Sequence, residues 1–217
     1  MKLEIIDSPT ERTTAATDLL LAAQGFIWAW YIPTIGDNVP WQATIWAWAW
    51  ALIGLGSFLG AIAHGLKMER KPYIRTWRGI ALILGLAMGL FSVAGVYDLL
   101  GEAVARQFLP IGILISLGFF CFTFFGPETF LVFIVYEAVI LILAVLTYSW
   151  LGLTGQLPGA WLMVVGVILA LIAAVIQAKE SLTMTFIWQF DWNGIFHLMQ
   201  LLSNAVVLLA IRMNYLG

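Results

Sequence analysis

Seven long apolar segments, separated by short polar breaks, make up most of this chain. Each is close to the roughly 20 residues that a helix needs to cross the hydrocarbon core of a bilayer. The segments are 14–32, 43–66, 78–99, 108–125, 129–150, 160–178 and 194–213. Their apolar runs are continuous, unlike the short alternating strands of a membrane β-barrel. We therefore expect an all-α, polytopic membrane bundle of seven transmembrane helices.

The breaks between the segments carry residues that favour turns. They are Pro33 with 36–38, Pro72, Gly126 with Pro127, 155–158, and Lys179 with Glu180. No linker or low-complexity run stands out among them. The sequence therefore predicts a single domain covering residues 1–217.

Composition supports a membrane protein. Hydrophobic residues make up 62% of the 217 positions and charged residues only 10%, and the mean hydropathy is +0.97. A soluble domain needs far more charge on its surface than this. The net charge of −2 gives no basic signal for nucleic acid, so we expect membrane lipids as partners and no nucleic acid.

Basic residues fall unevenly on the two sides of the predicted bundle. If the segments alternate in direction, eight of the ten lie on one side, and Arg106 and Arg212 lie on the other. Five surround the second break: Lys67, Arg70, Lys71, Arg75 and Arg78. The positive-inside rule then places the amino terminus in the cytoplasm.

Two pairs of glycines have the four-residue spacing that allows membrane helices to approach closely. Gly56 and Gly60 lie in the second segment, and Gly85 and Gly89 lie in the third. One interpretation is that these two segments pack against each other at the glycines. The other is that glycine is simply common in membrane helices.

The last segment carries four polar residues, Asn193, His197, Gln200 and Asn204, at positions i, i+4, i+7 and i+11. On a helix this spacing places them on one face. Polar groups at membrane depth are costly unless they face protein or a water-filled cavity. The stripe therefore predicts a site inside the bundle.

The two histidines of the chain, His64 and His197, are both expected near the cytoplasmic ends of their helices. We predict that their side chains face the same interior space. Ser57 lies on the same face as His64, two turns deeper, and Asp191 and Asn193 flank the start of the last helix. These five residues are the candidate polar site.

Three interpretations of this site remain open. A zinc centre would use both imidazoles with Asp191 or Asn193, because catalytic zinc takes three protein ligands and keeps a position for water. Metal-activated water could then attack a lipid amide or ester. A haem or pigment would use one or both histidines as axial ligands. Alternatively, both histidines simply form hydrogen bonds to backbone or to lipid headgroups.

Glu137 lies in the middle of the fifth segment, where a charged carboxylate is costly. We expect it to be protonated or paired inside the bundle, with a role in proton relay, in headgroup binding or in packing. Its candidate partners are Gln24, Gln177, Gln200 and Asn204. By contrast, Asp98 ends the third segment and is expected to be solvated.

Seven segments, a histidine on the second and the run FDWNGIFH at the start of the seventh resemble the CREST superfamily of membrane hydrolases. Alkaline ceramidases and the progestin and adipoQ receptors belong to it. The resemblance implies a zinc bound by one histidine from helix two and two from helix seven, with an assisting aspartate and serine. The run is also similar to small bacterial membrane proteins with FDHN, which implies the bacterial inner (plasma) membrane.

Carried over by position, His64 matches the helix-two ligand and His197 matches one helix-seven ligand. No second histidine lies four residues from His197, and Trp192 stands where FDHN has a histidine. Ser57 is the nearest serine before His64, and the cytoplasmic half of the third segment has no aspartate. The resemblance therefore implies a shared fold more strongly than a shared activity.

The leading interpretation is a CREST-like membrane protein with a cytoplasmic-side polar cavity, acting as a metal-dependent hydrolase of lipid amides or esters. The alternative is a non-catalytic subunit that binds lipid, haem or pigment alongside other membrane subunits. The candidate residues are Ser57 and Asp191 for catalysis, His64, His197 and Asn193 for zinc, and Glu137, Gln200 and Asn204 as intramembrane polar groups.

Overall fold

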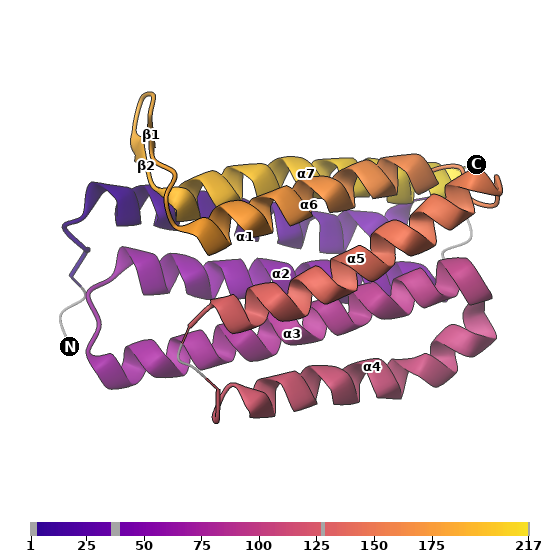
Figure 1. Ribbon diagram of the computed structural model, residues 1–217, viewed down its shortest axis with the longest axis horizontal. Coiled ribbons are helices and arrows are strands. Elements are labelled where there is room, and N and C mark those ends of the chain that lie inside the picture. Colours follow the sequence, from indigo (N-terminus) through magenta and orange to yellow (C-terminus); the bar gives the residue numbers. More distant parts are fainter. Residues whose placement is uncertain (1–3, 36–39, 127–128, 217) are drawn as a thin grey trace.

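The computed structural model describes residues 4–35, 40–126 and 129–216 (Figure 1). The described helices are α1 (Pro9–Tyr31), the 3-10 turn η1 (Ile32–Thr34), α2 (Trp41–Gly65), α3 (Arg70–Leu100), α4 (Glu102–Phe122), α5 (Leu131–Leu153), α6 (Ala160–Lys179) and α7 (Trp192–Leu216). Each predicted segment corresponds to one α-helix, and the all-α class is confirmed. The turn signals at 36–38 and at Pro127 lie outside the described residues.

Six of the described helices, α2 to α7, are long and apolar enough to cross a membrane, which fits an integral membrane protein. The helix α1 is not among them. Its 23 residues would suffice in length, but Thr14, Thr17, Asp18 and Gln24 lower its hydropathy.

The helices form a closed ring. Neighbouring pairs in contact are α1 with α2, α2 with α3, α3 with α5, α5 with α6, α6 with α7, and α7 with α1. The remaining helix, α4, packs against α3 on the outside of this ring (Figure 1). Successive helices run in opposite directions, so the two chain ends lie at opposite ends of the bundle (Figure 1).

Most of the basic stretch that was expected as a loop is helical. The helix α3 begins at Arg70 rather than at residue 78. Pro72 does not prevent this, because it lies in the first turn, where a backbone N–H has no partner within the helix. The bundle therefore presents these basic side chains on an ordered helical turn.

The glycine pairs do not join α2 to α3 as predicted. Gly60 faces the Asp18 carboxylate of α1, and Gly85 and Gly89 face α4. Only Gly56 lies against a side chain of α3. Of the two interpretations left open, packing of these helices at both glycine pairs is therefore not what the structure has, because α2 and α3 each have more than one neighbour and spacing alone does not tell which neighbour a glycine meets.

Asp98 is not simply solvated. Its Oδ1 accepts a hydrogen bond from Gln42 Nε2 at 2.7 Å, and its Oδ2 accepts one from the Tyr148 hydroxyl at 2.8 Å. These contacts link α2, α3 and α5 near the end of the bundle where α1 ends. The expectation from sequence was wrong, because Gln42 and Tyr148 lie 56 and 50 residues away from Asp98 along the chain.

A short hairpin precedes α7 and was not predicted. Its strands, β1 (Met184–Thr185) and β2 (Gln189–Phe190), pair in antiparallel fashion. The turn between them exposes Phe186, Ile187 and Trp188. In Figure 1 the hairpin projects from the bundle at the end where α1 begins.

Candidate functional site

The ring of helices encloses a cavity of about 520 Å³. This volume lies within the roughly 300–1,000 Å³ that is usual for small-molecule sites. Apolar and aromatic side chains, among them Trp46, Phe91, Phe119 and Phe133, form much of its wall. Most of its polar side chains come from the half of the bundle where α1 begins.

All four residues of the α7 stripe line this cavity. Three of them contact different helices through their side-chain amides. Asn193 Oδ1 accepts from Gln177 Nε2 of α6 at 2.5 Å. Gln200 Nε2 donates to Glu137 Oε1 of α5 at 3.4 Å, and Asn204 Nδ2 donates to Gln24 Oε1 of α1 at 3.1 Å. The stripe thus joins α7 to three neighbours while it faces the cavity.

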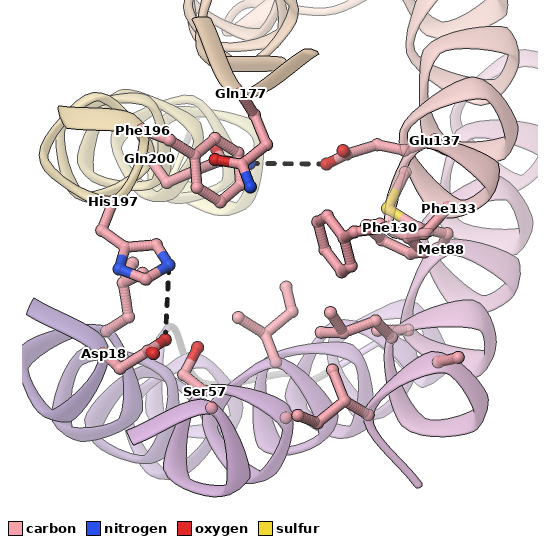
Figure 2. A pocket seen from close by; sticks show the side chains of 18 of the residues that line it. Asp18, Ser57, Met88, Phe130, Phe133, Glu137, Gln177, Phe196, His197 and Gln200 are labelled. Carbon is pink, nitrogen blue, oxygen red and sulfur yellow. Dashed lines mark hydrogen bonds and ion pairs between the residues drawn. The ribbon is translucent and has the colours of Figure 1, made fainter. Parts of the chain in front are cut away.

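His197, the fourth member, is buried against α1. Its Nδ1 lies 2.9 Å from Thr17 Oγ1, and its Nε2 lies 3.4 Å from Asp18 Oδ1 (Figure 2). Asp18 is buried as well. The pair is therefore a carboxylate–imidazole contact inside the bundle, on the wall of the cavity.

His64 lies on the same cavity, at the end of α2. Its Nδ1 is 2.7 Å from Glu11 Oε2, and its ring centroid is 6.4 Å from that of His197. The prediction that the two histidines share one interior space is confirmed. Each of them also has an acidic partner on α1, which the sequence had not indicated.

Asp18 is the main residue that sequence reasoning missed. A signal was present, because Asp18 is the single acidic residue in segment 14–32 and lies on one helical face with Thr14 and Thr17. Gly60 of α2 makes room for it, since a Cβ at that glycine would lie 2.8 Å from Asp18 Oδ2. The sequence pattern contains the spacing of Gly60 but does not show that this glycine accommodates Asp18.

The two candidate catalytic residues are placed differently. Ser57 is buried on the cavity wall, close to Asp18 in Figure 2. Asp191 instead caps α7: its Oδ1 accepts from Gly194 N at 3.1 Å and from Thr14 Oγ1 at 3.2 Å. A side chain of this type just before a helix normally satisfies an N–H of the first turn. Asp191 is thus engaged in helix capping, not in the cavity.

The predicted zinc ligands are not assembled for a metal. His197 has a partner at each ring nitrogen, and the Asn193 side-chain oxygen accepts from Gln177. Across the described ranges, no group of three or more His, Cys, Asp or Glu side chains is placed to hold an ion. The residues as arranged do not fit a three-ligand zinc centre, because protein contacts occupy both nitrogens of His197 and the side-chain oxygen of Asn193.

Several buried polar atoms of the cavity residues have no hydrogen-bond partner in the described structure. The acceptors are Asp18 Oδ2, Glu137 Oε2 and Gln177 Oε1, and the donors are Nε1 of Trp50 and of Trp77. Leaving such a group unsatisfied costs about 1–3 kcal/mol. Atoms of this kind are rare in folded proteins, and these five belong to residues that line one cavity, although the atoms themselves are buried in its wall.

Residues 13–215 match the sequence pattern of a described family. The chain belongs to DUF6962, a family of unknown function. The DUF6962 match includes Asp18, His64, Glu137, His197 and the rest of the α7 stripe, whereas Glu11 lies before it. No curated protein and no solved structure matches the chain.

Proposed function

We propose that this DUF6962 protein is a seven-helix integral membrane protein that binds an amphipathic membrane molecule inside its helical ring. The observation that supports this most directly is the cavity itself, whose wall is largely apolar but carries most of its polar side chains in the half of the bundle where α1 begins. A ligand with a polar head and an apolar tail meets both parts of that surface.

In this proposal α1 also crosses the membrane, in addition to the six helices α2 to α7. It lies between α2 and α7 and closes the ring. Its polar residues Thr14, Thr17 and Asp18 are buried, so a span of low hydropathy exposes little of this polarity to lipid. In this proposal the polar half of the cavity lies on the cytoplasmic side of the bacterial inner membrane, which the CREST resemblance and the distribution of basic residues support.

Filling the cavity tests the proposal. Ala81 of α3 lines the cavity and is only partly buried, so Ala81→Phe directs a ring into the site. Ala103 of α4 is exposed and lies outside the lining, so Ala103→Phe is the matched control. We expect gently purified wild type and Ala103→Phe to carry a bound amphiphile in native mass spectra, and Ala81→Phe to have lost it. Equal retention by both variants would contradict the proposal.

Hydrolysis of a lipid amide or ester is the second candidate. The His64–Glu11 contact on the cavity wall favours it, because an imidazole oriented by a carboxylate at one nitrogen is a typical general base, whereas both ring nitrogens of His197 are engaged within the protein. Zinc has no part in this candidate, since the residues as placed do not fit the metal. Turnover of long-chain esters or amides by wild type, lost in Glu11→Gln, would favour this candidate, and its loss with a chelator would favour the metal-dependent form.

Haem or pigment binding, and assembly with other membrane subunits, stay predictions. An apolar cavity lined by His64 and His197 is compatible with a coloured ligand. An absorption spectrum of protein purified gently with its partners distinguishes this from a colourless amphiphile.

A further inference from the structure

We propose that the hairpin between α6 and α7 is a membrane-surface anchor, whose apolar side chains enter the headgroup boundary of the adjacent lipid leaflet. The lipid that it contacts lies outside the protein, so this surface is separate from the cavity and from any ligand bound there. The inference therefore goes beyond the proposed function. It requires only that the helical bundle spans a membrane.

Apolar and polar residues alternate along the hairpin. The apolar residues at even positions are Leu182, Met184, Phe186, Trp188 and Phe190, and the polar residues at odd positions are Ser181, Thr183, Thr185 and Gln189. Successive side chains of a strand point to opposite faces, and Met184 pairs with Phe190 across the hairpin. The two strands therefore share one apolar face and one polar face. Residues 181–190 include no charged side chain.

Most of the apolar side chains of the hairpin are exposed. Phe186, Ile187 and Trp188 at its tip are 82%, 70% and 65% exposed. Leu182 and Met184 are exposed as well, and only Phe190 of the apolar residues in the hairpin is buried. A contiguous apolar surface of this kind marks a contact with a membrane or with another protein.

The base of the hairpin is fixed to the bundle. The strand β2 contacts both α1 and α7. The Phe190 ring packs on the first turn of α7, where a Cβ added to Gly194 would lie 3.0 Å from Phe190 Cδ1. The next residue, Asp191, accepts hydrogen bonds from Gly194 of α7 and from Thr14 of α1. The position of the hairpin beside the bundle is therefore set by these contacts.

This position corresponds to the membrane surface. Both α6, which ends at Lys179, and α7, which begins at Trp192, are long and apolar enough to cross a membrane. The hairpin between them therefore lies where the chain leaves and re-enters the lipid. Figure 1 shows it projecting sideways beyond α6 and α7, across the direction of the helices. A hairpin directed along the helices would stand in water, whereas this one follows the membrane surface.

Lipid is the partner that fits this surface. Tryptophan and phenylalanine are suited to the boundary between headgroups and acyl chains, and the polar face can meet headgroups and water. Val175, one turn before the end of α6, is exposed, so lipid already surrounds the bundle at this level. Lys71, Arg75 and Lys179 are exposed at the same end and attract anionic headgroups. Another protein would have to displace this lipid.

Spin labels test the anchor in the full-length protein, reconstituted into vesicles of phosphatidylethanolamine and phosphatidylglycerol. In a Cys121→Ser background, Phe186→Cys places a label on the apolar face, and Thr185→Cys places the matched control on the polar face of the same strand. Power saturation measures collisions of each label with oxygen, which concentrates in lipid, and with a nickel chelate, which stays in water. We expect the label at 186 to collide with oxygen and to lose its collisions with the chelate. The label at 185 should keep them.

Two contrary results would overturn the anchor. If the chelate reaches both labels equally, the hairpin stands in water. If neither reagent reaches the label at 186, and dilution with unlabelled protein restores access, a second copy of the chain covers the hairpin instead. All labelled positions are exposed, so the substitutions leave the packing of the bundle intact, and Ile187→Cys repeats the comparison at the tip. Neither contrary result bears on ligand binding in the cavity.

Discussion

The contact between Asp18 and His197 depends on a proton, because an unprotonated imidazole nitrogen and a carboxylate oxygen each present a lone pair. The Thr17 hydroxyl donates to Thr14 O at 2.8 Å, so its oxygen accepts from the Nδ1–H of His197. A neutral imidazole then has no proton at Nε2, which faces Asp18 Oδ1 at 3.4 Å. The pair therefore needs one further proton, on the imidazole or on the carboxyl group. In both cases Asp18 Oδ2 remains an acceptor.

At the same scale, we predict that Asp191 stabilises the fold by capping α7. Asp191→Ala removes the acceptor for Gly194 N and for Thr14 Oγ1, and should lower the free energy of unfolding by about 0.5–2 kcal/mol. Asp191→Asn keeps a capping oxygen and should cost less. Equilibrium unfolding in detergent measures both. Wild-type stability in Asp191→Ala would show that the cap is unimportant.

Among the elements, α1 and α4 are unlike the other five helices. The buried face of α1 is polar and supplies Asp18, while α4 lies outside the ring and buries few residues, such as Ala105, Ser116 and Phe119. Gly89 of α3 and Gly112 of α4 meet where these helices cross. Because lipid is as apolar as the side chains, the hydrophobic effect does not drive helices together in a membrane. Close packing of backbones, as at these glycines, stabilises the pair instead.

The α3–α4 contact predicts opposite effects for two glycine substitutions on α3. Gly89→Ala places a Cβ 3.0 Å from Gly112 O, so the helices must shift, and unfolding should be easier by about 1–3 kcal/mol. At Gly79 an added Cβ meets only Leu59 at 3.8 Å, an ordinary contact. Gly79→Ala should therefore stabilise the helix by about 0.5–1 kcal/mol. Thermal unfolding of both variants checks this, and equal midpoints would rule out the crossing.

For the whole molecule, the ring explains why a polar site and an apolar exterior coexist. Each of the six ring helices contributes at least one polar side chain to the cavity lining, and long apolar side chains such as Leu146 and Leu153 remain exposed on the outside. Lipid can cover this exterior, while the interior keeps its hydrogen bonds. The two ends of the bundle differ in charge, with most basic residues at the end where α1 begins.

This asymmetry predicts the orientation in the membrane. Ser181 and Gln156 are both exposed, in the connections after α6 and after α5, at opposite ends of the bundle. In a Cys121→Ser background, Gln156→Cys should react with a membrane-impermeant thiol reagent on intact cells. Ser181→Cys should react only after permeabilisation. The reverse pattern would place the amino terminus outside.

The sequence by itself determined the helices and the direction of the main polar face. Hydrophobic runs of membrane length and the spacing of Asn193, His197, Gln200 and Asn204 are local properties, and local geometry translates them directly into helices and a face. The shared space of His64 and His197 also followed, because alternating helices bring their positions to the same depth. The helices and the polar face are properties of single segments, and the meeting of the two histidines needs only the alternating direction of those segments.

Only the tertiary structure decided which residues meet. Asp18 and Thr17 reach His197 across a separation of about 180 residues, Gly60 makes room for Asp18, and Gln42 finds Asp98. These pairings depend on the order of helices around the ring and on the rotation of each, which the periodicity of one segment does not contain. The buried oxygens without a partner in the described structure follow from those pairings, because residues of other helices engage only one side-chain atom of Asp18, Glu137 and Gln177.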